Sequence, residues 1–92
     1  MLDVIVPVYR DVKQTQLCLE SVLGVPQVLD RELVVIDDAT PEPELAAYLD
    51  HLAQSSLITL VRNDRNLGFV GSVNLGVSLH PARDVVLLNS DT

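Results

Sequence analysis

The sequence predicts an α/β domain built on an open, Rossmann-like parallel sheet. Short runs of valine, isoleucine and leucine alternate with amphipathic segments of about 10–15 residues, a spacing typical of crossover helices between parallel strands. Proline, glycine, asparagine or aspartate marks most of the junctions. The expected order is β-α-β-α-β-α-β in a single domain, residues 1–92.

The first strand and helix are expected near the N-terminus. Residues 4–8 (Val-Ile-Val-Pro-Val) form the kind of β-branched run that is covered on both faces of a sheet. Pro7 is expected at the end of this strand, because proline donates no hydrogen bond to a central ladder. Asp11 is a suitable N-cap for a helix from about Val12 to Leu23, and Gly24 ends it.

The second strand is expected at residues 33–36 (Leu-Val-Val-Ile). Thr40 followed by Pro41 predicts the start of the next helix, with Thr40 as its cap and the proline at the first helical position. Apolar residues then recur at helical spacing on one face: Leu45, Tyr48, Leu49 and Leu52.

The second half of the chain repeats the pattern. A third strand is expected at residues 57–61, followed by a polar loop at 62–68. Phe69, Val73 and Val77 indicate a third helix, which stops at His80-Pro81. A fourth strand at residues 84–88 should pair with the first, and its outer edge predicts self-association of the chain.

Composition narrows the function classes. Thirteen acidic and six basic side chains give a net charge of −7, which argues against a nucleic-acid binder and against docking on anionic lipid. The longest apolar runs are far too short to span a bilayer, and the N-terminus has no secretory signal pattern. The single cysteine, Cys18, cannot form an internal disulfide, so we expect a cytoplasmic protein.

Polar side chains follow the expected strands, and ligands of open parallel sheets bind outside these carboxyl ends. The ends carry residues 7–10, Asp37-Asp38, the 62–68 loop and residues 89–91. Asn89 and Asp91 are two positions apart, so an extended segment would present both oxygens to one side, as a hard divalent cation requires. For Asp37 and Asp38, capping of the next helix is an equally good interpretation.

Four segments in register resemble the family 2 glycosyltransferases of GT-A fold, in their N-terminal, nucleotide-sugar-binding half. They are residues 4–10 (VIVPVYR), 34–40 (VVIDDAT), 66–76 (NLGFVGSVNLG) and 88–92 (LNSDT). The resemblance implies transfer of a sugar from a nucleotide-diphosphate sugar, with a UDP-sugar as the expected donor, to a hydroxyl of a saccharide or lipid-linked acceptor. The acceptor-binding half, which supplies the catalytic carboxylate, has no counterpart here. The resemblance therefore implies a fold truncated after its fourth strand and no catalytic residue in this sequence.

The resemblance also implies roles for particular residues. Its nucleotide-binding set is Pro7, Val8, Tyr9, Arg10, Asp38, Gly68, Asn74, Asn89 and Ser90. Within this set, Asp38 would accept a hydrogen bond from the base, most often from N3–H of uracil, while Asp37 would cap or orient. Asn89-Ser90-Asp91 stands where the family has its DXD triplet, so Asp91 would be the ligand of Mg²⁺ or Mn²⁺. Two departures are Asn89 in place of the first aspartate and Ala39 in place of a glycine.

Three other classes of protein are alternatives to a glycosyltransferase: one fits the sequence equally well and two fit it less well. A non-catalytic nucleotide- or cation-binding module acting within an assembly fits the same residues. A receiver-like phosphoacceptor needs its acidic pair after the first strand and a late lysine, whereas the one lysine here is Lys13. A dinucleotide-binding domain needs the G-x-G-x-x-G turn, which is absent between the first strand and its helix.

Overall fold

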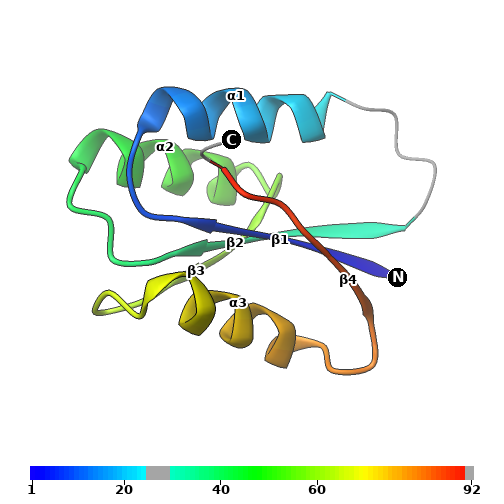
Figure 1. Ribbon diagram of the computed structural model, residues 1–92. Helices are drawn as coiled ribbons and strands as arrows, with labels where there is room; N and C mark the ends of the chain where they lie inside the picture. The colour runs from blue at the N-terminus through cyan, green and yellow to red at the C-terminus, as the bar shows by residue number, and fades with distance from the viewer. Residues whose placement is uncertain (25–29, 91–92) are drawn as a thin grey trace.

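The computed structural model describes residues 1–24 and 30–90, and it contains a four-stranded parallel sheet between two helical layers. The strands are β1 (Leu2–Val8), β2 (Arg31–Asp37), β3 (Thr59–Arg62) and β4 (Asp84–Leu87), in the order β3-β2-β1-β4. Helices α1 (Val12–Leu23) and α2 (Pro43–Gln54) cover one face, and α3 (Gly68–Leu79) covers the other (Figure 1). The predicted α/β order and the pairing of β4 with β1 are confirmed.

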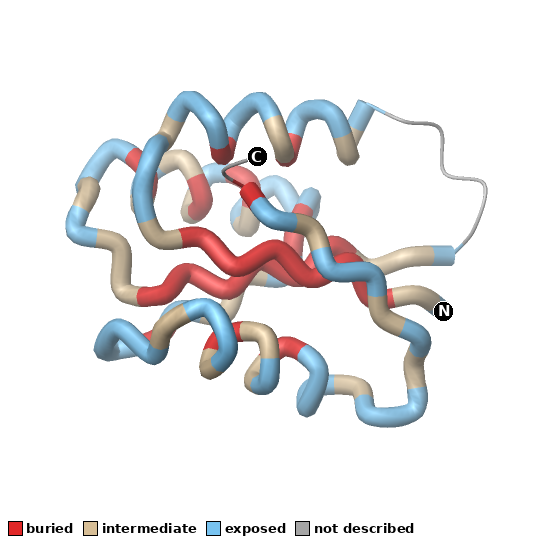
Figure 2. The backbone as a smooth tube through the Cα atoms, in the orientation of Figure 1, coloured by how far each residue is buried: buried red, intermediate tan, exposed pale blue. Residues whose placement is uncertain are grey.

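The two central strands form the core. Residues 3–8 of β1 and 33–37 of β2 are all buried, so these strands are covered on both faces (Figure 2). On the side of α1 and α2, Val4, Val6 and Val35 pack with Leu45 and Leu49. The helical periodicity therefore identified the buried face of α2 correctly.

Helix α3 approaches the sheet through small residues instead of the stripe expected from its sequence. Its buried residues are Ser72 and Gly76, whereas Phe69 is 50% and Val77 39% exposed. A Cβ built on Gly76 would lie 2.8 Å from Cγ2 of Ile5, so only glycine permits this approach. Phe69, Val73 and Val77 correctly predicted a helix, but they do not mark the face that packs on the sheet, where Leu75 joins Ser72 and Gly76.

Several element boundaries differ from the expected ones; β1 and β2, for example, each begin two residues earlier. Helix α2 begins at Pro43, because Glu42 precedes this proline and is held in an extended conformation, with φ −93° and ψ 110°. Thr40 caps a preceding turn instead, accepting a hydrogen bond from the Glu42 N–H at 3.2 Å. Strand β3 begins at Thr59, because the N–H of Leu57 still donates to the Leu52 carbonyl at the end of α2.

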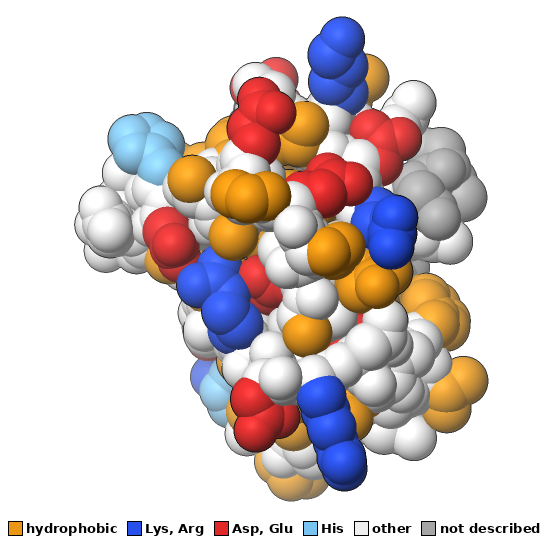
Figure 3. All heavy atoms as spheres, turned by 90° about the vertical axis from the view of Figure 1, so that its left-hand side faces the viewer, with side chains coloured by type: hydrophobic (Ala, Val, Ile, Leu, Met, Phe, Trp, Pro, Cys, Tyr) orange, Lys and Arg blue, Asp and Glu red, His pale blue; other side chains and the backbone are white. Residues whose placement is uncertain are grey.

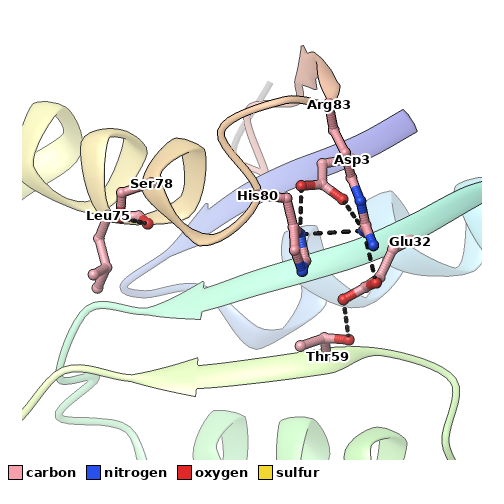
Figure 4. Close-up of polar contacts among 7 residues, drawn as sticks. All are labelled: Asp3, Glu32, Thr59, Leu75, Ser78, His80 and Arg83. Carbon is pink, nitrogen blue, oxygen red and sulfur yellow. Dashed lines mark hydrogen bonds and ion pairs between the residues drawn. The ribbon is translucent and has the colours of Figure 1, made fainter. Parts of the chain in front are cut away.

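A charged cluster joins the amino ends of β1 and β2 to the α3–β4 connection (Figure 4). Nη1 of Arg83 lies 2.9 Å from both the Asp3 and the Glu32 carboxylates, and His80 Nδ1 lies 2.7 Å from Asp3. The Asp3 side chain is fully buried. Burial raises the pKa of Asp3, but the hydrogen bonds from Arg83 and His80 outweigh it and lower that pKa below its usual 3.8.

Strand β4 lies at an edge of the described sheet. The Leu88 N–H donates to the Ile5 carbonyl, so the N–H groups of Val85 and Leu87 point to the open side. Val86 and Leu87 are 46% and 45% exposed.

Self-association through this edge stays a prediction, and sedimentation velocity tests it. Val86→Lys should weaken the association, whereas a wild-type monomer at high concentration would contradict it.

The charged cluster predicts that the free energy of unfolding decreases at low pH because Asp3 becomes protonated. The ionised Asp3 contributes stability that is present above pH 3.8 and is lost as the pH falls through its lowered pKa. Asp3→Asn should lower the free energy of unfolding at neutral pH by about 1–3 kcal/mol and flatten its decrease in acid. Urea unfolding at a series of pH values measures both effects. Asp64→Asn, an exposed control, should leave the profile unchanged, and an unchanged profile in Asp3→Asn would contradict the assignment.

Candidate functional site

An open cavity of about 390 Å³ lies at the carboxyl ends of β1 and β2, where the topology places a ligand. Its lining is drawn from four separate segments: Pro7, Val8, Tyr9, Arg10, Asp11, Asp38, Gly68, Phe69, Ser72, Asn89 and Ser90. Figure 3 views the molecule from this end and shows basic, acidic and hydrophobic side chains interspersed. The structure thus brings together eight of the nine residues expected to bind nucleotide.

The ninth residue, Asn74, does not line the cavity; it is an exposed position of α3. The expected metal ligand, Asp91, lies outside the described residues. Asn89, two positions earlier, does line the cavity, so the triplet begins at its wall.

Pro7 and Ser90 join the first and last segments of the cavity. Pro7 pairs in register with Ile36, while the ladder between β1 and β4 already ends at Ile5 and Leu87. The missing N–H of Pro7 therefore leaves no gap in the ladder, as its expected place near the strand end required. The buried Ser90 hydroxyl donates to the Pro7 carbonyl at 3.2 Å, which fixes the chain after β4 against β1.

Tyr9 and Arg10 form the cationic side of the cavity. The Arg10 guanidinium carbon lies 5.1 Å from the centroid of the Tyr9 ring, within cation–π range. Hydrogen bonds from Arg10 and Asn66 lower the pKa of Tyr9 below its usual 10.0. Arg10 is the one basic residue among the described residues that line the cavity.

The Asp38 carboxylate binds the start of α3. Oδ1 accepts from the Leu67 N–H at 2.7 Å and from Asn63 Nδ2 at 2.9 Å, and Oδ2 accepts from the Gly68 N–H at 2.9 Å. Helix α3 has no side-chain cap from its own N-cap residue. Asp38, at the end of β2, supplies the cap together with Asn66 Oδ1, which also accepts from the Gly68 N–H at 2.8 Å. Burial raises the pKa of Asp38, but the donors from Leu67, Asn63, Gly68 and Ser72 outweigh it and lower that pKa.

Asp37 has a separate, structural set of partners. Its Oδ1 accepts from the Thr40 N–H at 2.9 Å, and its Oδ2 pairs with Arg62 Nε at 2.7 Å. Arg62 also reaches Asp50 on α2, so this network ties the ends of β2 and β3 to that helix. These contacts agree with the capping and orienting role expected for Asp37.

Sequence reasoning missed four contributors to the site. Ser72 and Phe69 come from α3, and Asp11 follows β1; all three line the cavity. Asn63 stands behind Asp38 and binds it directly. The position of Asn63 directly after a strand was a usable signal, whereas the helical pattern of α3 concealed Ser72 on its buried face.

Two further features lie at the opposite end of the sheet. Ligand atoms of Asp3, Glu32 and His80 lie within 4.8 Å of one another, a spacing that suits a metal, but Arg83 already contacts all three side chains. A larger hollow of about 700 Å³ includes Arg31 and Glu32, whose charged groups are bound to the Val22 carbonyl and to Arg83. The smaller cavity at the carboxyl ends is therefore the better candidate for a ligand site.

Comparison with known proteins assigns the family. The Glycosyl transferase family 2 profile matches residues 3–92, so the chain belongs to this family. None of the curated proteins matches the chain significantly. Among the helices in residues 1–24 and 30–90, none is long and apolar enough to cross a membrane.

Solved structures of GT-A glycosyltransferases share the fold. The mannosyltransferase PcManGT from Pyrobaculum calidifontis, in complex with GDP-Man and Mn²⁺, is 24% identical with a TM-score of 0.78. S. aureus TarS 1–349, in complex with UDP-GlcNAc, is 23% identical with a TM-score of 0.76. Each alignment covers 98% of this chain but only 27% or 26% of the other, so the chain spans about a quarter of their length. The predicted family and the GT-A fold are confirmed.

Ala39, which stands where the family resemblance expects glycine, has a left-handed backbone with φ 59°. A residue with a Cβ is strained there by about 1–2 kcal/mol, part of which glycine loses again through its greater freedom in the unfolded chain.

Ala39→Gly should therefore raise the free energy of unfolding by about 0.5–1 kcal/mol. Differential scanning calorimetry measures this as a higher melting temperature. The same substitution at Ala47, an exposed position of α2, should lower stability by about 1 kcal/mol. A decrease in Ala39→Gly comparable to that in Ala47→Gly would contradict the strain at Ala39.

Proposed function

We propose that this chain binds the nucleotide part of a nucleotide-diphosphate sugar, with UDP-sugar as the preferred donor, in the cavity at the strand ends. Sugar transfer to a hydroxyl of a saccharide or lipid-linked acceptor would be the activity of the whole enzyme. The observation that carries this proposal is the convergence of eight expected nucleotide-binding residues on one cavity, in a family 2 glycosyltransferase fold. Asn74 does not line the cavity and has no part in this proposal.

The preference for uracil follows from the hydrogen bonds of Asp38. A carboxylate has about four acceptor positions, and N–H donors take two on Oδ1 and one on Oδ2. The Ser72 hydroxyl also interacts with this carboxylate, but its hydrogen can rotate away. At most one position remains for a base. Uracil presents a single imide donor, N3–H, whereas guanine presents two adjacent donors that suit a carboxylate with both oxygens free. Asp38 therefore favours UDP over GDP.

The phosphates would lie between Arg10 and the Asn89-Ser90-Asp91 triplet. The chain carries a net charge of −7, so an anionic ligand needs compensating positive charge. The donor set fits a hard cation, because the triplet offers carboxylate and amide oxygens, and Asp91 would be its protein ligand. When bound, Mg²⁺ or Mn²⁺ would neutralise the diphosphate and assist its departure as a Lewis acid. Arg10 would contribute the protein's own cation.

A second candidate is a non-catalytic module that binds nucleotide within an assembly. The same cavity supports it, because binding of a nucleotide there requires no acceptor site. We expect this chain alone to bind nucleotide and to transfer no sugar. Metal-dependent sugar transfer by the 92-residue chain would exclude the module and would overturn that expectation.

Calorimetric titration of UDP and GDP, with and without Mn²⁺, tests the assignments. The wild-type chain should bind UDP about tenfold more tightly than GDP, and Mn²⁺ should strengthen both. Asp91→Asn should abolish the Mn²⁺ effect and keep the base preference. Asp38→Asn should keep the Mn²⁺ effect and lose the preference.

The ratio of the two affinities is independent of the folded fraction, so loss of the α3 cap in Asp38→Asn does not obscure it. Equal binding of UDP and GDP by the wild type would refute the base assignment. A full Mn²⁺ effect in Asp91→Asn would refute the metal assignment.

A further inference from the structure

A pair of buried polar side chains stands behind Asp38. Asn63 follows β3 and is 8% exposed, and Ser72 on α3 is fully buried. Asn63 Nδ2 donates to Asp38 Oδ1 at 2.9 Å and to Ser72 Oγ at 3.2 Å. Its backbone N–H donates to the Asp37 carbonyl at 2.8 Å, which fixes the residue in place.

Burying the Asn63 amide lowers the stability of the fold unless the amide makes hydrogen bonds. An amide buried without partners loses about 1–3 kcal/mol, and a site built only for packing would use an apolar residue. Both hydrogens of this amide are directed at polar atoms of the site. Asn63 does not line the cavity itself, so any effect on a ligand acts through Asp38.

We propose that Asn63, supported by Ser72, is a positioning residue for base recognition: its amide fixes which Asp38 oxygen is left for the base. Asn63 and the Leu67 N–H together occupy Oδ1. Oδ2 has Gly68 as its one N–H donor and keeps the remaining acceptor position. The inference rests on the proposed nucleotide function, because it concerns the same carboxylate.

Loss of the Asn63 amide vacates one acceptor position on Oδ1, which then has the Leu67 N–H as its one N–H donor. Each oxygen then has a free acceptor position, and guanine gains the second acceptor that the wild-type site denies it. Base preference is therefore determined by a residue that never contacts the base. A purely structural role for Asn63 predicts a less stable chain whose ratio of UDP to GDP affinity is unchanged.

The test is calorimetric titration of UDP and GDP against Asn63→Ala, with Leu52→Ala as a matched destabilised control. Leu52 is a buried residue of α2, which covers the opposite face of the sheet from α3. Asn63→Ala should reduce the ratio of UDP to GDP affinity about tenfold, while Leu52→Ala should lower the melting temperature and keep the ratio.

A second variant, Asn63→Asp, keeps the test decisive if Asn63→Ala does not fold. Two carboxylates at this distance share one proton at low pH and repel each other once both ionise. The ratio of UDP to GDP affinity in Asn63→Asp should therefore fall as the pH rises, while the wild-type ratio stays constant.

The outcomes separate the two claims. A wild-type preference that survives in Asn63→Ala, or a pH-independent ratio equal to wild type in Asn63→Asp, overturns the positioning role and leaves the proposed function intact. A wild type that does not discriminate UDP from GDP overturns both.

Discussion

The carboxylate of Asp38 joins the end of β2 to the start of α3, and the shape of the candidate site depends on that contact. Its oxygens bind the N–H groups of Leu67 and Gly68 at the helix terminus, and Asn66 Oδ1 shares the Gly68 N–H. Gly68 makes the turn possible with φ 79°, a backbone conformation that glycine adopts without strain. The cavity wall from α3 and the proposed acceptor for a base therefore depend on one side chain.

The packing of α3 explains why this contact is so close. Ser72 and Gly76 let the helix lie directly on β1, with Ile5 against the glycine backbone. A helix with larger residues on this face would stand farther from the sheet, and its N-terminus would not reach Asp38. The apolar residues displaced to the outer face, such as Phe69 and Val70, are 50% and 69% exposed. Because small residues occupy the face of α3 that packs on the sheet, larger apolar residues of this helix are left exposed.

The sequence was sufficient to predict the fold but not all of the contacts. The order of strands and helices along the chain, the α1 boundaries and the buried face of α2 follow from patterns that depend on near neighbours: β-branched runs, caps and apolar periodicity. Two prolines, Pro41 and Pro43, could each begin α2, and local patterns do not distinguish them. The buried face of α3 depends on the sheet on which the helix packs. Asp38, which Asn63 binds, and Asp3, which His80 contacts, lie 25 and 77 residues away from them in the chain, beyond any local pattern. The metal role of Asp91 and the cytoplasmic location stay predictions.

The most direct measurement is a crystal structure of this chain with UDP and Mn²⁺. Our account predicts uracil in the cavity at the strand ends, with N3 within hydrogen-bond distance of Asp38 Oδ2. The N–H groups of Leu67 and Gly68 should remain bound to the same carboxylate. A nucleotide bound elsewhere, or an Asp38 that keeps all its protein donors without contacting the base, would contradict the assignment of this carboxylate as both helix cap and base acceptor.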